Sequence, residues 1–271
     1  MRKGPSDLAD GPSPNALTER PASAFTTDLT SANGRSASLG GTDAAVSAAI
    51  SPVRLAPYLD AAGGGPSSAI RLYHWNIELS AAVYELLHFF EVALRNAMDS
   101  RLSTWNASQV DGRTGRERGR DWLLDPAPLL VRLVREKDIK EALRRAEISA
   151  RRRTGPRRRA PVEHEDILAN LSLGTWRYLL PDKDAGRRLL WDQALTHAFP
   201  SWSRAASDLT RAVDGILLLR NRVAHLEPLL NTDSVRAQLT NCRLVLDAID
   251  PAVAQWAMSW QRITRTIDDR P

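Results

Sequence analysis

An arginine, an asparagine and a histidine near the end of one apolar stretch are the residues in this sequence best suited to chemistry. Arg220, Asn221 and His225 follow the apolar residues that begin after Gly215, and Pro228 ends the stretch. An unperturbed imidazole titrates near a pKa of about 6.5 and can carry a proton near neutral pH. A guanidinium can donate two parallel hydrogen bonds to phosphate oxygens. RNA supplies its own nucleophile, the 2′-hydroxyl, so a proton carrier and a charge clamp suit RNA cleavage without a metal ion.

The spacing of the arginine and the histidine carries little weight alone, because an arginine-rich chain produces it by chance. Arg159 and His164 have the same spacing, but Pro161 lies between them, so no single helix is predicted to position both. Arg220 and His225 differ in context, since Asn221 follows the arginine and an apolar helix precedes all three.

On a single regular helix, the side chains of Arg220 and His225 do not lie on the same face. Successive α-helical residues turn by about 100°, which places Arg220 about 140° around the helix from His225. Either the long arginine side chain reaches around, or a second copy of the helix completes the site across a two-fold axis. The residues also fit a plainer interpretation, in which cations in a last turn stabilise a helix end by about 0.3–1 kcal/mol each through the helix dipole.

Apolar residues recur at steps of three or four through most of the chain, which predicts α-helices. No strand-like alternation occurs, so the predicted fold class is all-α, a bundle of roughly seven or eight helices. The longest predicted helix covers residues 68–105. Later predicted helices cover residues 129–150, 162–180, 189–199, 203–224 and 233–249, and a last one begins at 251.

The long first helix carries a second candidate group. Glu91 and Arg95 are four residues apart, so they share a face and can pair. The pair is either a solvated ion pair or a buried one that lines the same cleft as Arg220.

The N-terminal part of the chain differs in composition from the rest. Residues 1 to about 50 are rich in Ser, Ala, Thr, Gly and Pro, and such a segment buries too little apolar surface to offset its ordering entropy. A short, weak helix is predicted within residues 51–62, and Gly63–Pro66 then breaks the chain. We therefore predict a disordered or weakly ordered segment at 1–66 and a helical domain at 67–271.

The overall composition narrows the function classes. Lys and Arg total 37 against 32 Asp and Glu, with a pI near 9.8, which mildly favours an anionic partner such as RNA. Cys242 is the single cysteine, and the histidines lie on separate predicted helices, so neither a disulfide framework nor a metal site nor a cofactor is expected. No apolar run is long enough to span a membrane and no secretion signal is seen, so the expected location is the cytoplasm.

An arginine run could add an RNA contact outside the motif. Each arginine–phosphate contact releases counterions and so favours binding. The run could equally be a solvated loop. Its members are Arg151, Arg152, Arg153, Arg157, Arg158 and Arg159.

Five blocks in this order resemble the Abi-like (abortive infection) family of the HEPN superfamily. The resemblance covers about residues 68–250, and the blocks are specific only when taken together. They begin at Tyr73-His74-Trp75-Asn76, Glu91-Val92-Ala93-Leu94-Arg95-Asn96, Leu171-Ser172-Leu173-Gly174-Thr175-Trp176, Leu190-Trp191 and Leu219-Arg220-Asn221-Arg222-Val223-Ala224-His225.

The resemblance implies a HEPN-like helical bundle that forms a homodimer, with an Arg–polar–x3–His signature lining a cleft between protomers. The matching residues are Arg220, Asn221 and His225. Those expected to line the cleft around them are Glu91, Arg95, Asn96, Arg222 and Glu227. Two departures are visible: relatives often carry a second histidine where this chain has Leu226, and an aromatic residue where it has Thr175.

The expected function is therefore a metal-independent endoribonuclease of a bacterial phage-defence or toxin type. RNA and a second copy of the chain are the expected partners, and an antitoxin or defence partner stays unidentified. The alternatives are an RNA- or nucleotide-binding module of the same fold that does not cleave, and a helical protein-interaction scaffold.

Overall fold

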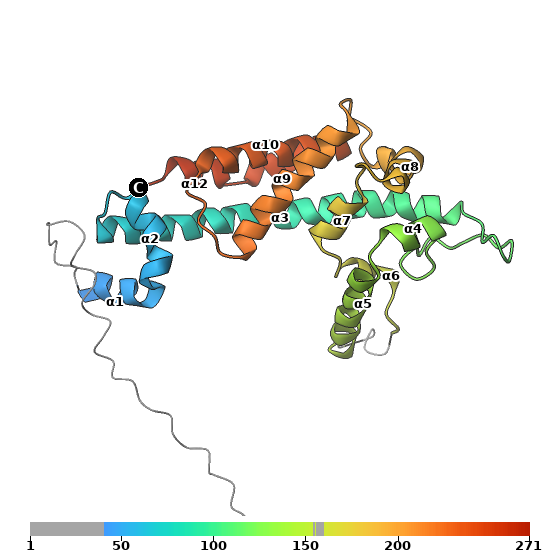
Figure 1. Cartoon of the computed structure of the whole chain (residues 1–271), viewed down its shortest axis with the longest axis horizontal. Coiled ribbons are helices and arrows are strands. Elements are labelled where there is room, and N and C mark those ends of the chain that lie inside the picture. Colours follow the sequence, from blue (N-terminus) through green and yellow to red (C-terminus); the bar gives the residue numbers. More distant parts are fainter. Residues whose placement is uncertain (1–40, 154, 156–159) are drawn as a thin grey trace, which may run out of the picture.

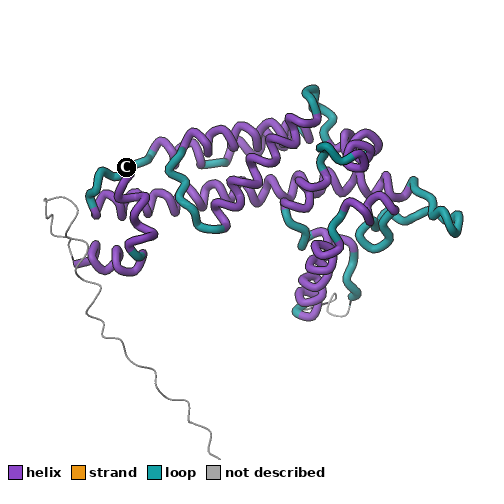
Figure 2. The backbone as a smooth tube through the Cα atoms, viewed as in Figure 1, coloured by secondary structure: helices purple, strands orange, loops and turns teal. Residues whose placement is uncertain are grey.

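Helices and the loops that join them form the structure that we describe (Figures 1 and 2). It is a computed structural model, and it describes residues 41–153, 155 and 160–271. Within these residues no strand occurs, and Val110 and Glu117 form only an isolated bridge, so the all-α prediction is confirmed. The elements are α1 (Gly41–Ile50), α2 (Pro52–Ala61), α3 (Pro66–Ala107), α4 (Pro128–Leu133), α5 (Glu136–Arg151), α6 (His164–Leu168), α7 (Leu173–Leu179), α8 (Ala185–Gln193), the 3₁₀ helix η2 (Leu195–Ala198), α9 (Ala206–Ala224), α10 (Thr232–Ile249), α11 (Pro251–Trp260) and α12 (Ile263–Asp268).

Helix α3 is the axis on which the other helices pack. Its 42 residues extend over about 60 Å at 1.5 Å per residue. It begins with Pro66, whose fixed φ and missing N–H suit the first position of a helix. Apolar residues at steps of three and four give it one continuous buried side, including Leu79, Phe90, Leu94 and Met98. The periodicity therefore predicted this helix within two residues at either end.

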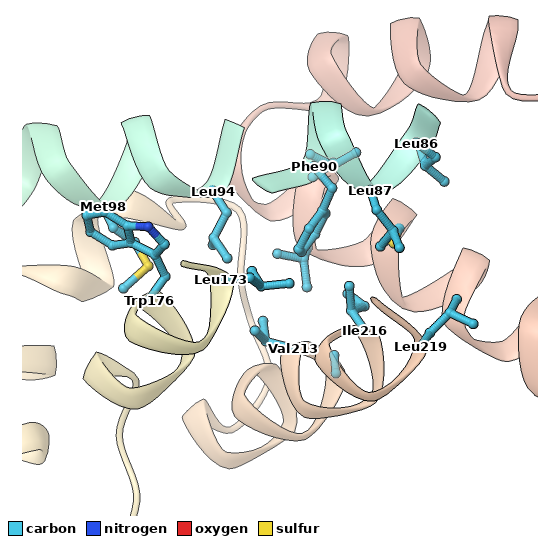
Figure 3. Close-up of a cluster of buried hydrophobic side chains, with 14 of the residues drawn as sticks. Leu86, Leu87, Phe90, Leu94, Met98, Leu173, Trp176, Val213, Ile216 and Leu219 are labelled. Atoms are coloured by element: carbon cyan, nitrogen blue, oxygen red, sulfur yellow. The ribbon is translucent and has the colours of Figure 1, made fainter. Parts of the chain in front are cut away.

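Helix α9 crosses α3 obliquely and forms the centre of the core with it (Figure 1). Figure 3 shows Phe90 and Leu94 of α3 facing Val213 and Ile216 of α9, all four fully buried. On another side of α9, Gly215 lies against Gln238 of α10, whose Oε1 would be 2.2 Å from any Cβ at that position. A side chain at position 215 would therefore displace the amide end of Gln238.

The first two described helices are attached to the N-terminal part of α3. Tyr58 of α2 is fully buried and makes an edge contact with Tyr73 of α3, and Leu55 is buried beside it. Residues 41–61 are thus helical, and α2 packs on the core although it precedes the predicted boundary at residue 66. Residues 1–40 of the predicted weakly ordered segment lie outside the described part of the chain.

A buried histidine ties α6 to α3 at the other end of the molecule. His164 Nε2 lies 2.9 Å from Asp99 Oδ1, and Trp122 Nε1 donates to the same oxygen over 2.8 Å. Burial lowers the pKa of His164, but the hydrogen bond and charge of Asp99, with smaller effects of Asp121 and Glu165, leave it above the ordinary 6.5. This cluster supports α5, which projects from the bundle and packs mainly against α6 (Figure 1).

None of the described helices combines the length and the apolar character that crossing a lipid bilayer requires.

The His164–Asp99 pair predicts a pH dependence of stability. Because the folded-state pKa is raised, the contribution of the pair is fully present below about pH 6.5 and is lost as pH rises through that folded pKa. The free energy of unfolding, measured by urea titration, should therefore fall between pH 6 and pH 8 more steeply in the parent than in Asp99→Asn. The amide oxygen of that variant still accepts from Trp122. His88→Gln, on the exposed side of α3, should keep the parental slope, and equal slopes in all three proteins would contradict the assignment.

Candidate functional site

The arginine–histidine motif lies in the last turn of α9 and in the turn that ends it. Arg220 and Asn221 are half-buried in the helix, whereas His225 is exposed and forms its C-cap. The Leu226 N–H donates to the Val223 carbonyl over 3.1 Å, and the Glu227 N–H donates to the Arg222 carbonyl over 2.8 Å. This pair of hydrogen bonds is a Schellman motif, the usual closure of a helix.

Leu226 occupies the left-handed position of this motif, where glycine or asparagine is usual. Its φ is 57°, and its side chain is 66% exposed. A left-handed conformation costs a residue with a Cβ roughly 1–2 kcal/mol. Because the Leu226 side chain is largely exposed, its burial offsets little of that cost. Neighbouring contacts must therefore hold Leu226 in place.

Two arginines bind carbonyls of the segment that follows this helix end. Arg222 Nη2 donates to the Pro228 carbonyl over 2.6 Å, and Arg222 Nε lies 3.4 Å from the Glu227 carboxylate. Arg54, which comes from α2, donates to the Leu226 carbonyl. Arg222 and Glu227, expected to line the cleft, thus close the helix end.

A buried asparagine fixes the chain just beyond the motif. Asn76 of α3 is 5% exposed, and its Oδ1 accepts from the Leu229 N–H over 2.6 Å. Neither Asn76 nor Arg54 was predicted as part of the site. The sequence holds a signal for Asn76, a polar residue next to the buried stripe of Leu72, Trp75 and Leu79, but none for Arg54.

Arg220, Asn221 and His225 take no part in this closure. Within the described residues, none of their side chains makes a hydrogen bond or an ion pair. The arginines that bind carbonyls here are Arg222 and Arg54, and their acceptors are Pro228 and Leu226. No protein group in the described part of the chain therefore occupies the hydrogen-bonding atoms of these three side chains.

Among the described residues, no hydrogen bond or ion pair joins the block on the first long helix to the motif. Figure 3 places Leu219, which precedes Arg220, at the level of Leu86 and Leu87, about one turn before Glu91. His225 lies at the far end, where the chain leads to α3 at Asn76. Glu91 is thus on the Arg220 side of the motif.

Arg95 and Asn96 lie a further turn along α3, away from the motif. Arg95 Nε donates to Asn96 Oδ1 over 3.3 Å, and no ion pair with Glu91 occurs among the described residues. One chain alone therefore does not bring this block together with His225.

The arginine run is described only in part. Arg151 and Arg152 are exposed, and Arg153 pairs with Asp166 of α6. Arg157, Arg158 and Arg159 lie outside the described residues. The second arginine–histidine pair does not form a candidate site. Its histidine, His164, is buried and paired with Asp99.

No cluster suited to a metal ion appears in the described part of the chain. Cys242 is completely buried, and burial raises the pKa of its thiol to about 12. A thiol of this kind is inert toward metals and nucleophilic chemistry. The groups available for chemistry at the end of α9 are thus an imidazole, a guanidinium and an amide.

The strained position predicts a stabilising substitution. Leu226→Gly should raise the free energy of unfolding by about 0.5–1 kcal/mol, because glycine adopts a positive φ without a Cβ clash and part of that gain is offset by a freer unfolded chain. Leu218→Gly is the matched control, since Leu218 is also 66% exposed but lies inside α9. It should lower stability by about 1 kcal/mol. Urea unfolding of both variants decides, and a loss of stability in both would place the strain elsewhere.

Comparisons with protein-family models, with curated proteins and with solved structures give no match to this chain.

Proposed function

We propose that this chain is a metal-independent endoribonuclease of the HEPN type, with Arg220, Asn221 and His225 as its catalytic residues. The observation that supports the proposal is that, among the described residues, these three side chains make no hydrogen bond or ion pair. The helix end beside them is closed by backbone hydrogen bonds, and Arg222 and Arg54 bind the carbonyls that follow it. The resemblance to the Abi-like family supports the same residues independently of their geometry.

The reaction needs only groups that the motif provides. His225 accepts the proton of the RNA 2′-hydroxyl, whose oxygen then attacks the adjacent phosphorus. The bond to the 5′-oxygen breaks, and that oxygen takes up a proton. The products are a 2′,3′-cyclic phosphate and a 5′-hydroxyl. General acid–base catalysis of this kind contributes about 10²–10⁴-fold.

Arg220 stabilises the charge that builds on the phosphate oxygens during this step. A preorganised donor at such a position contributes roughly 3–4 kcal/mol to the transition state. Asn221 shares a face with His225 and orients the imidazole or contacts the phosphate.

A second copy of the chain supplies the other half of the proton transfer. Leu218, Asn221 and His225 follow one another at steps of three and four, so they share one face of α9. Leu218 is 66% exposed on that face, although it is a large apolar residue. A two-fold dimer that covers this face brings two histidines to one phosphate, one as base and the other as acid.

The biological setting that we propose is phage defence or a toxin system, in which RNA cleavage stops growth. Expression in a bacterial host tests this directly. Parent protein should arrest growth with loss of RNA, and His225→Ala should do neither.

The catalytic assignment predicts a specific loss of cleavage. In EDTA, purified parent protein should cut single-stranded RNA to products with 2′,3′-cyclic phosphate ends, read by mass spectrometry. His225→Ala should lose about 10²–10⁴-fold and Arg220→Ala about 10²–10³-fold in rate, because they remove the proton carrier and the clamp. The matched controls are His88→Ala and Arg211→Ala, an exposed histidine on α3 and an exposed arginine elsewhere on α9. Both should keep parental rates.

Two other outcomes would contradict the proposal. RNA binding without any product, unaffected by His225→Ala, would identify a binding module. Cleavage at the parental rate by both motif variants would place the active site elsewhere.

A further inference from the structure

One contact joins Leu226, whose backbone is strained, to a helix that begins just after a second strained residue, Ser51. Among the described residues, Ser51 and Leu226 are the non-glycine positions with positive φ, at 74° and 57°. Ser51 has a ψ of 148°, in a region that is nearly exclusive to glycine, and it precedes α2. Arg54 lies on the first turn of α2, and its guanidinium donates to the carbonyl of Leu226. Residues more than 170 positions apart in the sequence are thus linked at the candidate site.

Strained conformations persist only where several contacts determine them, and they concentrate at functional sites. Around Leu226, α9 contributes Arg222 and α3 contributes Asn76. The third contact, from Arg54, is the one made to Leu226 itself. Helix α2 can support it, since Tyr58 and Leu55 anchor that helix in the core.

We infer that Arg54 is a positioning residue for His225, and that it acts by holding the left-handed turn at Leu226. His225 is the residue immediately before this turn, and its side chain has no partner of its own within the described residues. The direction of its Cβ therefore depends on the backbone of the cap. Catalytic groups must be held within about 0.5 Å of the productive geometry, and a supporting contact of this kind determines whether they are.

This inference rests on the proposed function for its activity readout, but its structural readout is independent. In the full-length protein, Arg54→Ala should increase the hydrogen exchange of the Leu226 and Glu227 amides, which donate to the Val223 and Arg222 carbonyls within the turn. Arg71→Ala, an exposed arginine on α3, should leave these amides unchanged. Unchanged exchange in Arg54→Ala would overturn the inference whether or not the protein cleaves RNA. Faster exchange in a protein whose parent never cleaves RNA would uphold the contact and reject the ribonuclease.

Measuring kcat and KM for RNA cleavage separates an effect of Arg54 on the position of His225 from an effect on protein stability alone. Arg54→Ala should lower kcat for RNA cleavage by about 10–100-fold, the cost of a misplaced catalytic group, with KM nearly unchanged. Arg54→Lys, which still donates to a carbonyl, should recover most of the rate. A loss confined to KM, or no rescue by lysine, would count against positioning.

A double substitution tests the route of the effect. Asparagine adopts the left-handed conformation readily, so Leu226→Asn should hold the turn with less help. If Arg54 acts through that turn, Arg54→Ala should cost clearly less in the Leu226→Asn background than in the parent. An equal loss of kcat in both backgrounds would show that Arg54 acts by another route and would overturn the inference.

Discussion

The end of α9 has to be closed, and the way this chain closes it determines what its last turn can do. A helix terminus leaves four carbonyls without intrahelical partners, and each must find a donor. Glycine at the left-handed position would make that closure local and self-sufficient. Leu226 makes the same backbone bonds at a steric cost, and contacts from Arg222 of α9, Asn76 of α3 and Arg54 of α2 surround it. The candidate site is therefore coupled to the packing of three helices.

That coupling is possible because α3 extends past all of the elements concerned. Its first turns hold α2 through Tyr73 and Tyr58, and its middle packs on α9 through Phe90. Asn76 lies between these two regions, on a helix whose neighbouring positions are apolar. A buried amide without a partner would cost about 1–3 kcal/mol, so the Leu229 N–H and Asn76 fix each other. One straight helix thus sets the distance between α2 and the end of α9.

The helical architecture could be predicted from the sequence because periodicity is a local property. Steps of three and four from Leu72 to Met98 are enough to define α3, and glycines with Pro66 mark where it begins. The motif could be placed at a helix end for the same reason, since Pro228 follows it. The helical part of residues 41–61 was underestimated, because the stability of α2 comes from burying Tyr58 against α3 and not from its own sequence pattern.

The supporting contacts could not be predicted, because they join residues with no regular spacing. Arg54 and Leu226 are far apart in sequence, and nothing near Arg54 distinguishes it from other arginines of the chain. The shared face of Glu91 and Arg95 likewise suggested a pair that the structure replaces by a contact of Arg95 with Asn96. Spacing on a helix states which side chains are able to meet, whereas the choice among partners depends on the packing around them.

The helix dipole helps to decide between the structural and the chemical interpretation of the motif. Its field favours any cation in the last turn, so it cannot distinguish Arg222 from Arg220. Hydrogen bonds do distinguish them. Arg222 donates to the Pro228 carbonyl and lies beside the Glu227 carboxylate. Arg220 has neither a carbonyl nor a carboxylate as partner within the described residues. An arginine whose charge is favoured by the dipole but whose donors stay free is well suited to an anion that arrives from outside. The imidazole on the adjoining turn also has no partner within the described residues. A phosphodiester would match the proposed roles of both groups, because a guanidinium can bind its oxygens and an imidazole can transfer a proton.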